Sequence, residues 1–143
     1  MAGGFSEHPA VDLELPARPS SVTEARHAVT RLARAVGASE PEVALGVSEA
    51  VGNAVLHAFR DAEPGIIRVR ATPERGSLIV LVVDNGSGMA PNLGSRGLGF
   101  GIPLITQVAR DVHFDSSEQG TSVSMSFDAV PLSSAESRQG EPS

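Results

Sequence analysis

Hydrophobic positions along the chain follow two periods, one typical of strands and one typical of helices. Apolar and polar residues alternate over residues 11–15, which predicts a strand that ends at Pro16. From residue 22 to residue 36, apolar side chains recur every three or four positions, which predicts a helix closed by Gly37. A second stretch with helical period begins at Ser39 and continues to about Phe59. The first part of the chain therefore predicts one strand followed by two helices.

Both predicted helices begin with the pattern of a capping box. In that pattern a serine or threonine hydroxyl accepts a hydrogen bond from an amide of the first turn, and the side chain of a glutamate three residues later accepts one from the amide of that serine or threonine. Ser21 and Glu24 match the pattern at the first helix. Ser39 and Glu42 match it at the second, with Pro41 in the first turn. These residues predict where the two helices start.

The second half of the chain predicts short strands on both sides of a glycine-rich stretch. Two strands, at residues 66–72 and 78–83, are joined by a tight turn, and the glycine-rich stretch follows at residues 84–101. A short helix is predicted at residues 102–109, and a hairpin with strands at residues 112–116 and 122–127. The whole order is β-α-α-β-β-α-β-β. It predicts an α+β fold, a two-layer α/β sandwich in which a mixed β-sheet is covered on one face by about three helices.

Length and composition define the domain and exclude several kinds of site. The length of 143 residues corresponds to one domain, which we expect at residues 11–130. Residues 1–10 and 131–143 are rich in glycine, proline, serine and charge, and they predict disordered ends. The absence of cysteine excludes a disulfide scaffold and a thiol nucleophile. All eleven basic residues are arginine, so the obligatory lysine of a P-loop is absent too.

The charge and hydropathy of the chain argue against two classes of partner. The formal net charge is −6 and the sequence has no basic stripe, which argues against direct binding to nucleic acid. No apolar run reaches the length of a membrane span, and no basic segment precedes an apolar signal core. We therefore expect a cytoplasmic domain that binds neither nucleic acid nor membrane directly.

The longer predicted helix carries a polar stripe beside its apolar face. Glu49 and Asn53 are four residues apart, so their side chains lie one helical turn from each other. A carboxylate in such a stripe can accept a proton, and a carboxamide oxygen can bind a hard cation such as Mg²⁺. The alternative is an ordinary solvated flank of the helix.

A carboxylate followed by glycines ends the most apolar of the predicted strands. Asp84 directly follows residues 78–83 and precedes Gly86 and Gly88. Its carboxylate can accept a hydrogen bond from an exocyclic amine such as that of adenine, and the glycines allow close approach of the backbone to a ligand. The alternative is a simple turn, because Asp-Asn-Gly is also common turn chemistry.

Two further glycine-containing segments could contact a ligand. Arg96 and the alternating glycines up to Gly101 lie at the mouth of the short predicted helix, where backbone amides and a guanidinium suit phosphate. A flexible loop is the alternative there. Gly120 and Thr121 open the last predicted strand, and the alternative for that pair is a hairpin turn.

The order of these segments resembles the nucleotide-binding boxes of the Bergerat-fold (GHKL) ATPases. Glu49 with Asn53 is similar to the N box of that family, and the segments that begin at Asp84, Gly97 and Gly120 are similar to its G1, G2 and G3 boxes. The resemblance covers most of the predicted domain, in the order of the family.

Within that family, the chain most resembles the small stand-alone anti-sigma-factor serine/threonine kinases, which contain a histidine-kinase-like ATPase domain. Residues 48–59 are similar to their N-box helix, and residues 96–105 are similar to their G2 segment. The resemblance implies the two-layer Bergerat fold, with ATP and Mg²⁺ as ligands.

The resemblance also implies a role for each matching residue. Glu49 would be the general base that accepts the proton of an attacking hydroxyl, and Asn53 would hold Mg²⁺ against the phosphates. Asp84 would bind the adenine amine, with Thr121 completing the adenine pocket through water. The remaining ATP-binding positions would floor that pocket or end the lid over the phosphates: Gly86, Gly88, Arg96, Gly97, Gly99 and Gly101.

Partners are implied by the same resemblance. A kinase of this family holds a sigma factor inactive and phosphorylates a STAS-type anti-anti-sigma protein on serine or threonine, and a homodimer is part of the resemblance. Arg26, on the first helix, matches the position where such kinases carry an arginine on their partner-contact surface. The alternative is a solvated helix arginine.

Two departures from the family pattern keep a second function open. Only residues 89–95 separate Gly88 from Arg96, where these kinases have a longer mobile lid. Leu56 also replaces a lysine that is common in the N box. The alternative to a kinase is therefore a non-catalytic ATP-binding module that binds its partner without phosphoryl transfer.

Overall fold

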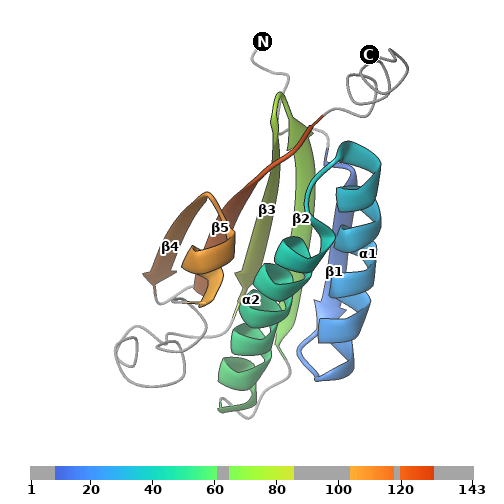
Figure 1. Ribbon diagram of the computed structural model, residues 1–143. Coiled ribbons are helices and arrows are strands. Elements are labelled where there is room, and N and C mark those ends of the chain that lie inside the picture. Colours follow the sequence, from blue (N-terminus) through green and yellow to red (C-terminus); the bar gives the residue numbers. More distant parts are fainter. Residues whose placement is uncertain (1–8, 61–64, 86–103, 118–119, 131–143) are drawn as a thin grey trace, which may run out of the picture.

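The chain forms one β-sheet with a layer of helices on one of its faces (Figure 1). The computed structural model describes residues 9–60, 65–85, 104–117 and 120–130. In chain order the elements are β1 (Val11–Pro16), α1 (Ser20–Val36), α2 (Glu40–Arg60), β2 (Ile66–Glu74), β3 (Ser77–Asp84), a short helix over residues 104–108, β4 (Asp111–Ser117) and β5 (Gly120–Asp128). The predicted two-layer α+β class is confirmed.

The strand order is β1-β2-β3-β5-β4, and every neighbouring pair is antiparallel. The prediction of a mixed sheet is therefore wrong for the described strands. The reason lies in the connections: α1 and α2 run in opposite directions, so the chain enters β2 opposite to β1 (Figure 1). Tight hairpins join β2 to β3 and β4 to β5, and a hairpin can join only antiparallel strands.

The core lies between the helices and the sheet. Every second residue of the three central strands is buried on the helix side: Ile67, Val69 and Ala71 in β2, Leu78, Val80 and Val82 in β3, and Val123, Met125 and Phe127 in β5. Small and branched residues of the helices complete this layer, among them Ala25 and Val29 of α1 and Val43 and Val47 of α2. The same alternation also buries two polar residues, Asp84 at the end of β3 and Thr121 near the start of β5.

The two predicted helix starts have different outcomes. Ser39 accepts a hydrogen bond on Oγ from the amide of Glu42, at 3.4 Å, as the second capping box predicts. The first box is wrong, because Pro19 is the N-cap of α1 and makes no side-chain cap bond. Ser21 lies inside the helix, is buried, and donates from Oγ to the carbonyl oxygen of Pro16 at 2.6 Å. Its hydroxyl therefore ties the helix to the end of β1 instead of capping it.

The predicted disordered ends, 1–10 and 131–143, lie outside the described residues except at residues 9 and 10. There the amide of Ala10 donates to the carbonyl oxygen of Ala71 at 2.8 Å, which extends the β1–β2 pairing by one residue. Within the described part of the chain, no helix has both the length and the hydrophobicity to span a bilayer.

Candidate functional site

The candidate site residues gather at one end of the sheet. Asp84, the last residue of β3, pairs with Ile67 of β2 on one side and with Thr121 of β5 on the other. Helix α2 ends at Arg60, and the chain re-enters the sheet at Ile66, one residue before Ile67. The C-terminal half of α2 therefore lies at the same end of the fold as Asp84 and Thr121 (Figure 1).

A row of three polar side chains crosses the sheet at this end. Asp84 and Thr121 are 6% and 7% exposed, and both lie on the helix side. Ser116 of β4 is the cross-strand partner of Thr121, and the two hydroxyl oxygens are 3.3 Å apart. The sequence reasoning singled out Asp84 and Thr121 but missed Ser116. The signal for it was the hairpin itself, because a turn between residues 117 and 120 places residue 116 opposite residue 121.

Gly120 allows this row to form. Its φ is 142°, and a Cβ atom at this position would lie 2.1 Å from the carbonyl oxygen of Asp84. A residue with a side chain would have to move one of the two strands, so only glycine fits. The sequence identified Gly120 as part of a glycine-threonine pair, and the structure adds that it lies against the backbone of Asp84.

The polar stripe of α2 borders the same layer. Gly46 faces β5, since a Cβ there would lie 2.8 Å from the ring of Phe127 and 3.2 Å from the sulfur of Met125. Asn53 is two helical turns further on, on the same side of the helix, with Glu49 one turn before it. Glu49 and Asn53 are both partly buried. The stripe is therefore an edge of the helix–sheet interface, not a fully solvated flank.

Asn53 has an unmet hydrogen-bonding atom. Its Nδ2 is buried and has no hydrogen-bond partner among the described residues. A buried polar atom without a partner costs about 1–3 kcal/mol, so a ligand that binds this amide gains from it. The oxygen of the same carboxamide is the type of ligand that Mg²⁺ takes, and Mg²⁺ needs only one or two such groups when phosphates supply the rest. Within the described ranges, no group of three or more acidic or histidine side chains could hold a metal ion by itself.

Glu49 is available as a proton acceptor. Among the residues that the structure describes, its carboxylate has no hydrogen bond and no ion pair. It lies one helical turn from Asn53, so a substrate hydroxyl that lies near the Asn53 amide would also be within reach of the Glu49 carboxylate. The two side chains are thus brought together as the sequence predicts.

The rest of the predicted nucleotide site lies outside the described residues. This holds for the predicted pocket floor and phosphate loop, that is, for Gly86, Gly88, Arg96, Gly97, Gly99 and Gly101. After these residues, the structure describes the chain again from Leu104, the first residue of the short helix, in which Ile105 is fully buried in the core.

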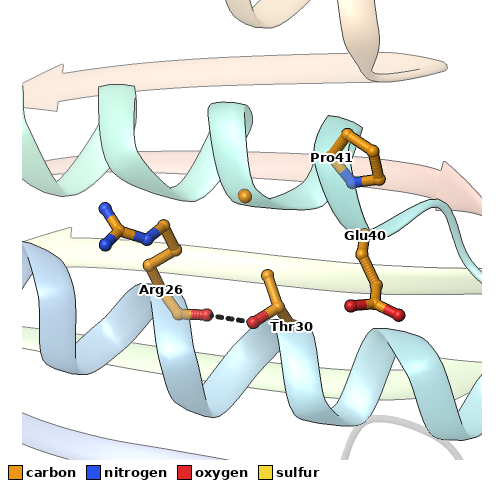
Figure 2. Close-up of a pocket in the computed structure, with 5 residues that line it drawn as sticks. Arg26, Thr30, Glu40 and Pro41 are labelled. Carbon is orange, nitrogen blue, oxygen red and sulfur yellow. Dashed lines mark hydrogen bonds between the residues drawn. The ribbon is translucent and has the colours of Figure 1, made fainter.

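A second polar surface lies between α1 and α2, where a groove of about 550 Å³ is lined by Arg26, Thr30, Glu40, Pro41 and Ala44. Figure 2 shows Arg26 reaching from α1 toward α2, and Glu40 pointing back from the first turn of α2. Glu40 forms an ion pair with Arg34, with Nε and Oε2 3.0 Å apart, and the hydrogen bond from Arg34 lowers the pKa of Glu40. The Arg26 guanidinium has no ion pair within the described part of the chain, so its charge is free for a partner.

Comparison with known proteins places these residues in one family. A family model described as histidine kinase-like ATPase domain matches residues 15–127, which include Glu49, Asn53, Asp84 and Thr121. Serine-protein kinase RsbW of Listeria monocytogenes is 36% identical over 83 residues, covering 56% of this chain and 53% of that protein. The chain thus spans about half the length of these Listeria relatives.

Other relatives and solved structures extend the comparison. Serine-protein kinase RsbW of Oceanobacillus iheyensis is 27% identical over 140 residues, covering 85% of this chain and 88% of that protein. An anti-sigma F factor of Clostridium botulinum is 31% identical over 72 residues, or 41% of this chain and 50% of that protein. The structure of the RsbU and RsbW domains of Mycobacterium tuberculosis Rv1364c has the same fold, with a TM-score of 0.61 at 22% identity over 86% of this chain and 34% of that chain.

Replacement of Gly120 by alanine should destabilise the protein more than the same change at Gly76. Both glycines have positive φ, but a Cβ at Gly76 would meet nothing within 4 Å. The Gly76→Ala variant should lose about 1–3 kcal/mol, the usual cost of an alanine at positive φ. The Gly120→Ala variant should lose more, because the Asp84 carbonyl blocks its side chain. Urea unfolding of both variants measures the difference, and equal losses would show that the contact with Asp84 has no energetic weight.

Proposed function

Because the chain belongs to the histidine kinase-like ATPase domain family, we propose that it is an ATP-binding serine/threonine kinase that also acts as an anti-sigma factor. In this proposal it sequesters a sigma factor and phosphorylates a STAS-type anti-anti-sigma protein. The observation that carries the proposal is the buried Asp84–Thr121 pair at the end of the sheet toward which α2 runs from Glu49 through Asn53. The names of its relatives, serine-protein kinase and anti-sigma factor, support the same function.

The adenine base is proposed to bind at the end of β3. A carboxylate only accepts hydrogen bonds, so Asp84 suits the exocyclic amine of adenine and disfavours a base that presents a carbonyl there. Thr121, beside it in the sheet, completes the pocket through water. Gly86 and Gly88 form its floor in this proposal, and the phosphates lie against the backbone amides of residues 96–101.

Mg²⁺ is proposed to be held by the carboxamide oxygen of Asn53 and by the nucleotide phosphates. The buried, unpartnered Nδ2 of this residue is a donor that a phosphate oxygen of the same ligand would satisfy. When bound, the ion neutralises charge on the transferred phosphoryl group. The protein itself supplies position, through the rigid helix that carries Asn53 and Glu49 one turn apart.

Glu49 is proposed as the general base. It accepts the proton of a serine or threonine hydroxyl on the partner, while that oxygen forms a bond to the γ-phosphorus and the bond from this phosphorus to the bridging oxygen of ADP breaks. The lack of an ion pair to Glu49 among the described residues supports this role, because a carboxylate tied to an arginine is a weaker base.

Partner proteins are proposed to dock on the groove between α1 and α2. Arg26 supplies a cation there that no described carboxylate neutralises, beside the ion-paired Glu40. An acidic side chain of the sigma factor or of the anti-anti-sigma protein is the complementary group. Thr30 and Pro41 line the same groove and provide its uncharged part.

The second candidate function is a non-catalytic ATP-binding module. The short segment between Gly88 and Arg96 favours it, since a short lid covers less of a triphosphate. The presence of Glu49 favours the kinase. Incubation with γ-labelled ATP, Mg²⁺ and the anti-anti-sigma proteins of the same genome separates the two functions.

The proposal includes a homodimer formed through the open face of the sheet. The helices cover one face, and the described elements leave the other free (Figure 1). From β1 to β4, this open face carries in turn an acidic, a basic, an apolar and a serine stripe, and on β4 two carboxylates with a histidine between them: Asp12 and Glu14; Arg68 and Arg70; Ile79, Leu81 and Val83; Ser122, Ser124 and Ser126; Asp111, His113 and Asp115.

Two copies can stack with their open faces together about a two-fold axis that is parallel to the strands, lies between the two sheets, and passes over the boundary between β3 and β5. The stripes of the two copies are then complementary. In that arrangement β3 of one copy lies over β5 of the other, so large apolar side chains pack on small serines at the usual spacing of stacked sheets. β2 then lies over β4, and Arg68 comes level with Asp115, because both belong to the register row that contains Ser122. Arg68 already donates to Asp12 at 3.2 Å and lowers the pKa of that carboxyl, but its guanidinium has further donors for a second carboxylate.

Replacement of Asp84 by asparagine should weaken ATP binding by about 10- to 100-fold, the cost of placing an amide donor against the adenine amine. The matched control is Asp128→Asn, because Asp128 is an exposed carboxylate at the other end of β5. Titration calorimetry measures both affinities, and thermal unfolding tests whether the fold is intact. Wild-type affinity in Asp84→Asn would mean that Asp84 is only a turn residue.

Replacement of Glu49 and of Asn53 by alanine should have different effects. Glu49→Ala should still bind Mg-ATP but should transfer phosphate about 10²- to 10⁴-fold more slowly, the usual contribution of a general base. Asn53→Ala should bind ATP more weakly and lose most of the Mg²⁺ dependence of binding. ATP titrations with and without Mg²⁺, together with single-turnover transfer, measure both effects.

Ser48→Ala on the same helix is the control for these two variants, and alanine favours helix in all three. If the wild type binds ATP but transfers phosphate to none of the anti-anti-sigma proteins of its genome, the non-catalytic module is the function. If Glu49→Ala transfers at the wild-type rate, Glu49 is not the base.

Charge reversal tests the proposed dimer. Arg68→Asp should shift the protein toward monomer in sedimentation, since like charges then face each other, and the double variant Arg68→Asp with Asp115→Arg should restore the dimer. Arg75→Asp is the control, because Arg75 lies in the β2–β3 turn. A wild type that is monomeric at every soluble concentration, or a double variant that does not recover, would contradict this interface.

A further inference from the structure

The hydroxyl of Ser116 lies directly behind Thr121, on the side away from Asp84. Thr121 is paired with Asp84 of β3 on one side and with Ser116 of β4 on the other. The Ser116 and Thr121 oxygens are 3.3 Å apart, and either hydroxyl can be the donor. Thr121 is buried and Ser116 is half-buried, so water competes little for the contact at the threonine. The three side chains form one row across β3, β5 and β4.

A hydroxyl has one proton, so the direction of this bond decides what Thr121 offers to a ligand. If Ser116 donates to Thr121, the threonine keeps its own proton and acts as a donor toward the site. If Thr121 donates to Ser116, only its lone pairs remain for a ligand. The χ1 angle of threonine is restricted by its branched Cβ, which leaves the proton as the main freedom.

Adenine needs the first of these two states. The ring nitrogen N1, next to the exocyclic amine, is an acceptor. In the proposed site the amine binds Asp84, whose two cross-strand neighbours are the apolar Ile67 and Thr121, so Thr121 is the neighbour that can serve N1. Thr121 must therefore donate, directly or through water, while Ser116 donates to Thr121. A base with an N–H at this ring position would need the opposite direction and would also place a carbonyl against the Asp84 carboxylate.

We propose that Ser116 is a positioning residue that orients the Thr121 hydroxyl and so contributes to the recognition of adenine. The proposal rests on the proposed ATP site. Ser116 does not touch the base. It acts through the proton of Thr121, and this separates it from a serine that only fills space at the edge of the sheet.

The test compares ATP with 1-deaza-ATP, in which N1 is replaced by a carbon and the amine is retained. Ser116→Ala should weaken ATP binding by about 3- to 10-fold, the effect of one neutral hydrogen bond, and should change the affinity for 1-deaza-ATP by less than about 2-fold. Thr121→Val should likewise weaken the binding of ATP and leave that of 1-deaza-ATP nearly unchanged. The double variant should be no weaker than Thr121→Val alone, because the two groups act as one unit.

Two further variants complete the experiment. Ser116→Thr keeps the hydroxyl and should restore ATP affinity. Ser77→Ala, at the opposite end of β3 from Asp84, should leave both affinities unchanged. Thermal unfolding of each variant shows whether the sheet is intact.

Four outcomes overturn the proposal. Wild-type ATP affinity in Ser116→Ala shows that Ser116 has no part in binding. Equal weakening of ATP and 1-deaza-ATP shows a structural role instead of a role in reading N1. A wild type that binds 1-deaza-ATP as tightly as ATP shows that N1 is not read, although the ATP site itself stands. If the wild-type protein binds neither nucleotide, the proposed function fails, and this inference fails with it.

Discussion

The close approach of Gly120 to the main chain of Asp84 is the contact on which the rest of the candidate site depends. Because no side chain separates the two strands there, β5 enters the sheet directly against the end of β3, and Thr121 pairs with Asp84. Ser116 follows one strand further out, in the same row. The order of carboxylate, hydroxyl and hydroxyl is thus set by a backbone contact, and the candidate site residues of the sheet take their places from it.

The topology brings the other half of the site to the same place. A pair of antiparallel helices between β1 and β2 returns the chain to the end of the sheet where β2 begins and β3 ends. This leaves the C-terminal half of α2, which begins just after Glu49 and contains Asn53, at the end of the sheet where β3 ends (Figure 1). One helix between the strands would have left β2 parallel to β1, so the second helix accounts for the antiparallel β1–β2 pair, which the sequence patterns do not predict. The β2–β3 hairpin then returns the chain to the start of β2, and this places Asp84 opposite Ile67, near the end of α2.

The elements themselves could be predicted from hydrophobic period, because burial of one face imposes a period of two on strands such as β3 and about 3.6 on helices such as α2. Pairing across the sheet could not be predicted in the same way, since β3 and β5 are brought together by contacts distant in sequence. Ser21 shows a second limit. Its spacing to Glu24 fits a capping box, but the nearby end of β1 offers the carbonyl of Pro16, and burial of the hydroxyl makes that bond the better one. Ser116 belongs to no motif, and only the predicted hairpin, which places it opposite Thr121, points to it.

The polar groups at the sheet end also connect binding to stability. Asp84, Thr121 and Asn53 occupy positions at which the rest of the helix–sheet interface is apolar, and the Asn53 Nδ2 has no partner within the described residues. The unpartnered Asn53 amide stabilises the free protein less than an apolar group of similar size would, because its desolvation is not offset by a hydrogen bond. A ligand that accepts a hydrogen bond from this amide would return part of that free energy, in addition to the stabilisation by mass action. At a ligand concentration of 100 Kd the mass-action term alone is about 2.7 kcal/mol. A domain of this size is typically stable by about 5–15 kcal/mol, so a ligand at that concentration would add a substantial fraction to the free energy of unfolding.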